Sequence, residues 1–217
     1  MVRYREGRGS AIALLVVALQ ALSVCANRKT LCYQSPESDQ SIFDFDIMDV
    51  HKEKMVNLSS YADQILLVVN VAGFCGSTHQ YLSLNALETD LDGFHVLGVP
   101  CNQFGKQEPG GNGTEILNSL KYVRPGNGFA PAFDLTEKVE VNGQNEHPLY
   151  TYLKSYCPPV DDIFHTEGPG IYYSPYRNGD VRWNFEKFLI NRQGKPVLRY
   201  HTNYHPETIR ADIIDML

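Results

Sequence analysis

The stretch ILLVVNVAGFCGSTHQYLSLNAL, residues 65–87, holds the pattern that decides the fold. Its first nine residues are mostly Val, Ile and Leu, which is typical of a strand buried on both faces of a sheet. Beyond Gly76 apolar residues recur at helical spacing, at Tyr81, Leu84, Leu87 and Leu91. The stretch therefore predicts a buried strand that leads directly into a helix, with Cys75 at the junction.

Outward from this unit, strand and helix patterns alternate along the chain. We expect strands at residues 42–47, 94–100 and 139–143, and a hairpin of two strands within 183–201. We expect helices at 114–123, with Thr114 as the N-cap, at 147–156 and at 206–217. A strand, a helix and a second strand in succession form a right-handed crossover. The order predicts an α/β protein with a thioredoxin-like fold, in which α-helices flank a central mixed β-sheet.

The first 26 residues show the three zones of a secretory signal peptide. Arginines precede an apolar run at residues 11–22, and small residues follow up to Ala26. The run is too short to cross a bilayer of roughly 30 Å, although a membrane-anchoring helix is the alternative. We expect a signal peptide at 1–26, a polar leader at 27–41 and one domain at 42–217, secreted to the extracellular space without a membrane contact. Asn57 and Asn112 begin Asn-x-Ser/Thr sequons and are candidate glycosylation sites in a secreted chain.

Composition narrows the classes of function. The 217 residues include 19 Lys and Arg against 25 Asp and Glu, a formal net charge of −6. A mildly acidic chain without a basic block is not expected to bind nucleic acid. Five cysteines are too few for a disulfide-built scaffold, so the fold depends on an apolar core and each cysteine needs its own explanation.

Cys75 is the main candidate for chemistry. A thiol at a helix N-terminus faces free backbone N–H groups and the positive end of the helix dipole, and both favour the thiolate. An ordinary buried cysteine is the alternative. The residues after Cys75 are Gly, Ser and Thr, so the C-x-x-C pattern of disulfide exchange is missing. The other cysteines are scattered, and His201 and His205 have no Cys pair beside them, so we expect no metal site.

Four blocks of sequence, in this order, resemble the glutathione peroxidases. They are VNVAGFCGSTHQYLSLNAL (69–87), VLGVPCNQFGKQEPG (96–110), SLKYVRPGNGFAPAF (119–133) and WNFEKFLINRQGKPVLRY (183–200). The resemblance extends from about residue 43 to the C-terminus and is strongest to the secreted, plasma and epididymal-type members. It implies the same thioredoxin-like fold that the strand and helix pattern predicts.

The resemblance also implies catalytic roles. Cys75 matches the peroxidatic position, which many relatives fill with selenocysteine, and Gln107, Trp183 and Asn184 match the other catalytic residues. The two amides and the indole N–H are neutral donors that stabilise an anion without locking it into an ion pair. Taken alone, Trp183 would be read as a core residue and Gln107 as a surface residue.

The implied reaction reduces hydrogen peroxide and organic hydroperoxides with glutathione, protects against oxidative stress and needs no cofactor. Cys75 passes through a sulfenic acid, which thiols reduce through a mixed disulfide. The region where many cysteine-using relatives carry a resolving cysteine, residues 117–133, has none, which favours an external thiol. Two alternatives stay open: a thioredoxin-dependent peroxidase, or a catalytically weak binding protein on this scaffold.

The remaining cysteines and two arginines carry further expectations. Cys101 ends a buried strand and is expected to pack, whereas Cys157 is expected to be exposed and could pair with Cys32. Arg124 and Arg199 match family positions near the substrate and are candidates to bind the glutathione carboxylates, with solvated charge as the alternative.

The loop at residues 122–133 is associated with the tetrameric branch of the family. Its phenylalanines, Phe129 and Phe133, suit a subunit contact in a homotetramer, or else a lid over the protein's own core.

Overall fold

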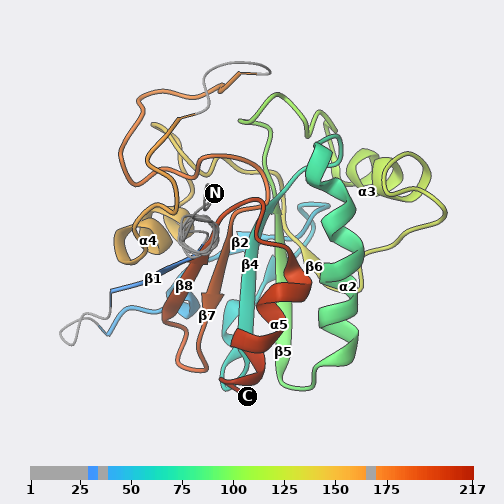
Figure 1. The fold of residues 1–217 in the computed structure, drawn as a ribbon. Helices are drawn as coiled ribbons and strands as arrows, with labels where there is room; N and C mark the ends of the chain where they lie inside the picture. The colour runs from blue at the N-terminus through green and yellow to red at the C-terminus, as the bar shows by residue number, and fades with distance from the viewer. Residues whose placement is uncertain (1–28, 34–38, 165–169) are drawn as a thin grey trace, which may run out of the picture.

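The computed structural model describes residues 29–33, 39–164 and 170–217 (Figure 1). The expected signal peptide, residues 1–26, lies outside these residues. The strands are β1 (Lys29–Leu31), β2 (Ile47–Met48), β3 (Met55–Val56), β4 (Ile65–Val71), β5 (Phe94–Pro100), β6 (Asp134–Leu135), β7 (Lys187–Ile190) and β8 (Pro196–Tyr200). The α-helices are α2 (Gln80–Asp90), α3 (Gly113–Tyr122), α4 (Pro148–Tyr156) and α5 (Pro206–Ile214), and the 3-10 helices are η1 (Ile42–Asp44), η2 (Leu58–Tyr61) and η3 (Gly76–His79).

Six strands form one mixed sheet in the order β1-β8-β7-β4-β5-β6. β4 pairs in parallel with β5, and β5 in parallel with β6, whereas β4–β7, β7–β8 and β8–β1 are antiparallel. β2 and β3 form a separate antiparallel pair. The central mixed sheet with flanking helices confirms the predicted thioredoxin-like fold.

Alternating side chains of β4 supply the two faces of the core. Ile65, Leu67 and Val69 pack with apolar residues of α2 and α5, which lie side by side in Figure 1. Leu66 and Val68 pack on the opposite face with α4 and with the segment that contains η1 and η2. All seven residues of β4 are buried, so the continuous apolar run follows from a strand covered on both sides.

Three local predictions differ from the structure. Residues 42–47 form η1 and β2 rather than one strand, because Ser41 and Asp44 make a reciprocal capping box that starts a helical turn. The N-cap of α3 is Asn112, whose Oδ1 accepts from the Glu115 N–H at 3.0 Å, and not Thr114. Residues 139–143 are not a strand among the described residues, since the Gln103 side chain takes the N–H groups of Val141 and Asn142.

The N-terminal leader is tied to the domain at two points. β1, within the leader, adds an edge strand beside β8. Cys32 follows it and forms a disulfide with Cys157 at the end of α4. Cys157 is fully buried, so the expectation that it is exposed is wrong, and its pairing with Cys32 is present.

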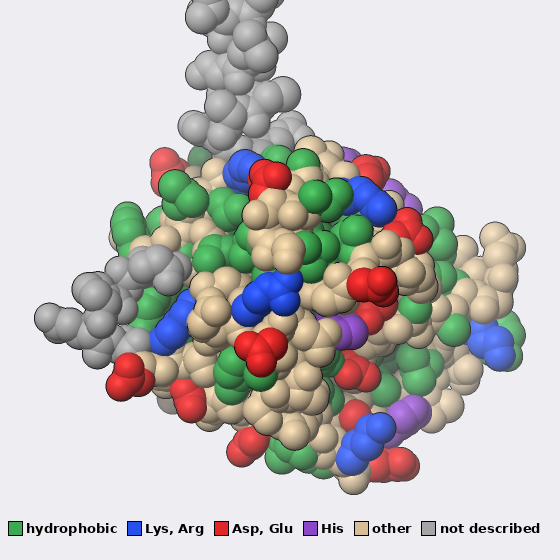
Figure 2. All heavy atoms as spheres, turned by 90° about the horizontal axis from the view of Figure 1, so that it is seen from below, with side chains coloured by type: hydrophobic (Ala, Val, Ile, Leu, Met, Phe, Trp, Pro, Cys, Tyr) green, Lys and Arg blue, Asp and Glu red, His purple; other side chains and the backbone are tan. Residues whose placement is uncertain are grey.

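The surface carries charges of both signs. On the face in Figure 2, acidic and basic side chains are interspersed among polar and apolar ones. Within the described part of the chain, no helix combines the length and the apolar character needed to cross a membrane.

Candidate active site

Cys75 lies where the central strand β4 gives way to a helix. It is the N-cap of η3, which continues into α2, and its Sγ accepts a hydrogen bond from the Ser77 N–H at 3.4 Å. The Thr78 hydroxyl donates to the Ala72 and Cys75 carbonyls, both at 2.8 Å, and so braces this turn. The sequence prediction of a strand–Cys–helix junction is confirmed. Only 3% of Cys75 is exposed.

The loop after β5 brings Gln107 beside Cys75. The Phe74 N–H, one residue before Cys75, donates to the Gln107 carbonyl at 2.9 Å. The Gly73 N–H donates to Glu108 Oε2 at 2.8 Å. Two successive amides of the turn before Cys75 are therefore held by two successive residues of the Gln107 loop.

Asn184 completes a contact between three chain segments. Its Nδ2 donates to Gln107 Oε1 at 2.9 Å, although Asn184 lies 77 residues further along the chain. The Asn184 side chain is fully buried. Among the described residues, Gln107 Oε1 accepts from Asn184, whereas Gln107 Nε2 has no protein acceptor.

Trp183 is half-buried and packs against both faces of the core, including the cluster that contains Cys75. Its ring centroid lies 5.8 Å from that of Phe104. Asn70, in the middle of β4, donates from Nδ2 to the Trp183 carbonyl at 3.0 Å. Its own carbonyl accepts the Phe185 N–H at 2.6 Å, so Asn70 fixes the backbone on both sides of Asn184.

The residues next to Gln107 and Asn184 include two with an unusual backbone conformation. Lys106, just before Gln107, has φ 50°, and Phe185, just after Asn184, has φ 64°. Side chains other than glycine rarely adopt positive φ, and such residues gather at functional sites. Both residues turn the chain sharply next to a side chain that the resemblance implicates.

The two candidate substrate-binding arginines differ in exposure. Arg124 is exposed, and its Nη1 donates to the Cys75 carbonyl at 3.3 Å, which places a cation at the edge of the site. Arg199 is fully buried, pairs with Glu186 at 2.7 Å and donates to the carbonyls of Cys157, Gly179 and Asp180. The expectation that Arg199 binds substrate is therefore wrong, because its guanidinium is enclosed and fully bonded inside the protein.

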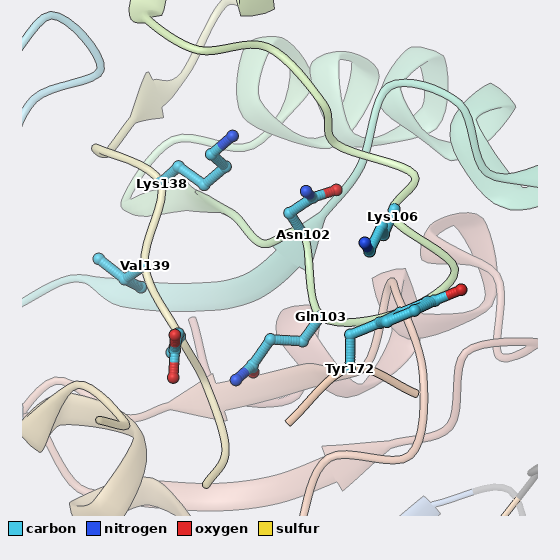
Figure 3. A pocket seen from close by; sticks show the side chains of 7 residues that line it. Asn102, Gln103, Lys106, Lys138, Val139 and Tyr172 are labelled. Atoms are coloured by element: carbon cyan, nitrogen blue, oxygen red, sulfur yellow. The ribbon is translucent and has the colours of Figure 1, made fainter. Parts of the chain in front are cut away.

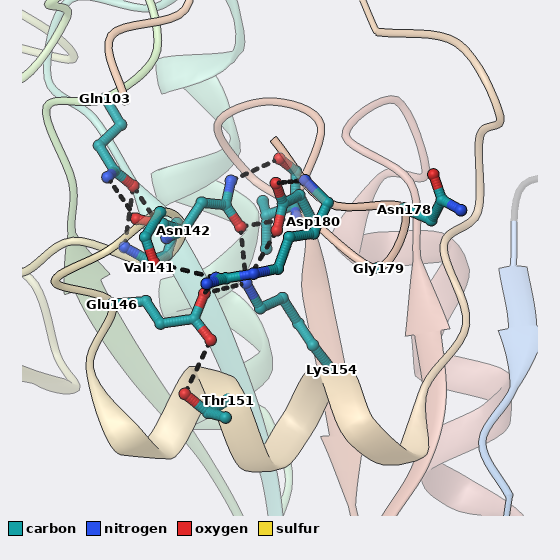
Figure 4. Close-up of polar contacts among 12 residues, drawn as sticks. Gln103, Val141, Asn142, Glu146, Thr151, Lys154, Asn178, Gly179 and Asp180 are labelled. Carbon is teal, nitrogen blue, oxygen red and sulfur yellow. Dashed lines mark hydrogen bonds and ion pairs between the residues drawn. The ribbon is translucent and has the colours of Figure 1, made fainter. Parts of the chain in front are cut away.

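A buried polar network includes Gln103, Asn142, Lys154 and Asp180 (Figure 4). Gln103 donates from Nε2 to the Asn142 carbonyl at 2.8 Å, and Asn142 Oδ1 accepts from Lys154 Nζ and from the Val181 N–H, both at 3.0 Å. Lys154 also pairs with Glu146 and Asp180. The network joins the loop after β5 to the residues that lead into Trp183.

A pocket of about 360 Å³ adjoins the same loop (Figure 3). Its lining includes Lys106, Lys138 and Tyr172, and the Lys106 ammonium lies 4.6 Å from the centre of the Tyr172 ring. No group of three or more potential metal-ligating His, Cys, Asp or Glu side chains occurs in the described ranges.

The two free cysteines of the described residues lie on opposite faces of the sheet. Cys75 belongs to the core cluster beneath α2 and α5, and Cys101 to the cluster beneath α4. Burial raises the pKa of Cys101 to about 12, which keeps it a neutral thiol. Cys101 therefore packs, as expected from the sequence.

The phenylalanines of loop 122–133 face the protein's own core. Tyr81 of α2 stacks on Phe133 with ring centroids 6.1 Å apart and meets the edge of Phe129 at 5.7 Å. Phe133 is 7% exposed. These ring contacts agree with a lid over the core, while the expected subunit contact in a homotetramer stays a prediction.

Two residues that organise the site, Asn70 and Glu108, were not predicted from the sequence. Asn70 is the one polar side chain in the run ILLVVNV, a signal that a buried amide must find a partner. Glu108 follows Gln107 directly, but nothing in the pattern indicates that its carboxylate turns inward.

Comparisons with known proteins agree with this geometry. A family model described as glutathione peroxidase matches residues 42–154. The chain is 44% identical to glutathione peroxidase 3 of Rattus norvegicus over 82% of this chain and 78% of the relative. It is also 44% identical to glutathione peroxidase 6 of Mus musculus, over 82% of this chain and 80% of that one.

Solved structures give the same result. The crystal structure of Trgpx in apo form is similar, with a TM-score of 0.57 and 35% identity over 82% of this chain and 96% of that chain. The crystal structure of T. cruzi GPX1 matches with a TM-score of 0.57 and 28% identity over the same shares. On the strength of the family model and of relatives that match most of its length, this chain belongs to the glutathione peroxidase family.

Proposed function

We propose that this protein is a peroxidase in which Cys75 attacks the peroxide and glutathione returns the electrons. One observation carries the proposal: Cys75 caps a helix with its sulfur on the Ser77 N–H, beside the hydrogen-bonded pair of Gln107 and Asn184. Family membership supports the reaction class, and the site supplies a nucleophile with neutral donors.

The cycle balances with two thiols for each peroxide. The Cys75 thiolate attacks one peroxide oxygen, the O–O bond breaks, and a proton completes the departing water or alcohol. Cys75 is left as a sulfenic acid. One glutathione condenses with it, releasing water and forming a mixed disulfide, and a second attacks that disulfide to release oxidised glutathione and restore the thiolate.

The side-chain amides have a defined part in this proposal. Gln107 Nε2 donates to the sulfur or to the departing oxygen as negative charge moves between them. Asn184 holds Gln107 in place by donating to its Oε1 at 2.9 Å. Trp183 completes the set with its indole N–H. Such donors need no reorganisation when the charge moves, because the buried backbone around Asn70 already fixes them.

The reductant is proposed to be an external thiol. Cys32 and Cys157 are already paired, and Cys101 lies on the other face of the sheet. Cys25 falls within the expected signal peptide and outside the described residues. A thioredoxin-type mechanism with an internal resolving cysteine therefore has no accessible candidate among the described residues. Arg124 is proposed to meet a glutathione carboxylate, since its exposed guanidinium reaches the Cys75 backbone.

The site is proposed to prefer small hydroperoxides, because Cys75 is only 3% exposed. Comparing rates with hydrogen peroxide and with a bulky lipid hydroperoxide tests this preference. Equal rates with both would contradict it.

Trapping of the intermediates tests the proposal directly. After one equivalent of peroxide, a sulfenic-acid reagent should label Cys75. If glutathione is added instead of the reagent, the Cys75 sulfenic acid should be converted to a disulfide between Cys75 and glutathione. Peptide mass mapping reads both products. Labelling elsewhere, or a disulfide between Cys75 and another cysteine of the chain, would contradict the scheme.

Secretion, glycosylation and assembly extend the proposal. Secretion is favoured by the signal-peptide pattern and by similarity to glutathione peroxidase 3. Asn57 and Asn112 are exposed, as glycan attachment requires. A homotetramer is proposed to use the exposed side chains of loop 122–133, such as Tyr122 at 68% exposure and Val123 at 61%. Sedimentation of wild type and a Tyr122→Ser, Val123→Ser variant tests that surface; tetramers of the variant would exclude it.

A further inference from the structure

Glu108 is a fully buried carboxyl that the proposed reaction does not use. It follows Gln107 in the loop after β5, and its side chain turns into the interior. Burying a carboxyl is costly unless it gains hydrogen bonds or a charged partner. The contacts of Glu108 therefore indicate what its position provides.

Its carboxylate holds the turn that leads to Cys75. Oε2 accepts from the Gly73 N–H at 2.8 Å, two residues before Cys75. The next amide, of Phe74, donates to the Gln107 carbonyl at 2.9 Å. The Glu108 side chain and the Gln107 backbone thus accept two adjacent hydrogen bonds from the same turn. Only the hydrogen bond to the Glu108 side chain can be removed by a substitution.

Gly73 lets α3 pack closely on this turn. A Cβ at position 73 would lie 3.0 Å from Ser119 Oγ, which is tighter than most Cβ contacts, and 3.5 Å from Glu108 Oε2, which is ordinary van der Waals contact. The missing side chain therefore relieves the contact with α3, while the Glu108 carboxylate is held on this turn by its hydrogen bond to the Gly73 N–H.

The Glu108 backbone is itself held from the other side. Its N–H donates to Asn102 Oδ1 at 2.9 Å, and its carbonyl accepts from Lys138 Nζ at 3.1 Å. Figure 3 shows Asn102 and Lys138 beside this loop. Because these contacts hold the Glu108 main chain, its carboxylate accepts from the Gly73 N–H in a fixed position.

We propose that Glu108 is a positioning residue for the reaction of Cys75. The Glu108 carboxylate keeps the turn before Cys75 aligned with Gln107 and Asn184, and its ionisation sets the strength of the hydrogen bond to the Gly73 N–H. The inference rests on the proposed peroxidase function and deepens it. Glu108 touches neither the sulfur nor the substrate and acts through Gly73.

The charge of Glu108 changes in the neutral range. Burial raises its pKa to about 7, while the Gly73 N–H and the Lys138 cation act in the opposite direction. The other titratable groups that face it are the Tyr81 hydroxyl and the Cys101 thiol. Hydrogen bonds to an ionised acceptor are roughly twice as strong as neutral ones. The hold on Gly73 therefore strengthens as pH rises through the pKa of Glu108.

Glu108→Gln tests the role, because glutamine keeps the size and one acceptor oxygen but removes the charge. Two rates of Cys75 are measured across neutral pH: reaction with hydrogen peroxide, followed by the fluorescence of Trp183, the only tryptophan, and alkylation by iodoacetamide. Alkylation needs only an accessible thiolate, whereas peroxide reduction also needs the aligned donors. In Glu108→Gln we expect the peroxide rate above neutral pH to fall by about tenfold, alkylation to change much less, and the inflection assigned to Glu108 to disappear.

Two further variants complete the design. Glu53→Gln, at an exposed carboxylate, should leave both rates unchanged. Lys138→Met removes the cation that lowers the Glu108 pKa and should move the inflection to higher pH, a test that stands even if Glu108→Gln does not fold. Equal losses in both rates, or an unchanged inflection in either variant, would overturn the inference. A wild-type Cys75 that fails to react with peroxide would instead overturn the proposed function.

Discussion

Two neutral amides are the donors proposed for the chemistry of Cys75, and the Arg124 cation lies at the edge of the site. The Gln107 amide reaches from one loop and the Asn184 amide from another, and the two are joined by a single hydrogen bond of 2.9 Å. Because Asn184 uses the Oε1 of Gln107, the free Nε2 group is oriented as a donor. The direction of one amide is therefore central to the proposed stabilisation.

Gln107→Glu isolates that donor. The carboxylate can still accept from Asn184, but it cannot donate and it adds negative charge near the sulfur. We expect the peroxide rate of Cys75 to fall by about 100-fold, as is typical when a transition-state donor is removed. Stopped-flow measurement of Cys75 oxidation checks this, with the exposed Gln144→Glu as the control. A variant as fast as wild type would exclude Gln107 as a donor.

Glu108 also makes stability depend on pH. Its pKa in the folded protein is about 7, above the ordinary glutamate value of 4.5, so the folded state holds the proton more tightly than the unfolded chain. This contribution is fully present below the unfolded pKa and is lost as pH rises through the folded one. The shift corresponds to about 3 kcal/mol.

Chemical denaturation at a series of pH values measures this contribution. In Glu108→Gln the corresponding decline in unfolding free energy between mildly acidic and neutral pH should be absent. A decline as steep as that of wild type would show that another group causes it.

At the scale of elements, the regular parts of the fold could be predicted and the irregular ones could not. The apolar run of β4 and the helical spacing of α2 follow from burial, which leaves a strong periodic signal. Residues 42–47 alternate like a strand, yet the local capping box of Ser41 and Asp44 starts a helical turn. Short-range polar contacts of this kind leave little trace in a hydrophobic pattern.

The candidate site shows the same division. Cys75 could be found from its place between a strand and a helix. Gln107, Trp183 and Asn184 came only from family resemblance, because they meet through loops whose course depends on distant contacts. Arg199 was misassigned for the same reason: only the structure shows that β8 turns this side chain inward toward Glu186.

Removing that arginine should be costly. Arg199→Met leaves the fully buried Glu186 carboxylate without its cation, and we expect a loss of about 3–5 kcal/mol in unfolding free energy. Arg210→Met, which breaks a surface pair with Asp90, should cost under about 1 kcal/mol. Denaturant titration of both variants makes the comparison, and similar losses would contradict the buried role of Arg199.

On the scale of the whole molecule, the Cys32–Cys157 disulfide closes a loop between residues 125 apart in sequence. A cross-link over that distance restricts the unfolded chain strongly. A Cys32→Ser, Cys157→Ser variant should lose about 3–5 kcal/mol of stability while Cys75 keeps its peroxide rate. Thermal and denaturant unfolding check the first part, and an unchanged midpoint would show that the disulfide does not stabilise the fold.

Cys75 is proposed to reduce peroxide with electrons from an external thiol. Steady-state peroxide consumption by the wild type and by Cys75→Ser, with glutathione and thioredoxin supplied side by side, is the decisive measurement. We expect turnover with glutathione in the wild type, little with thioredoxin, and none in Cys75→Ser. Equal turnover by the two proteins, or turnover with thioredoxin alone, would contradict it.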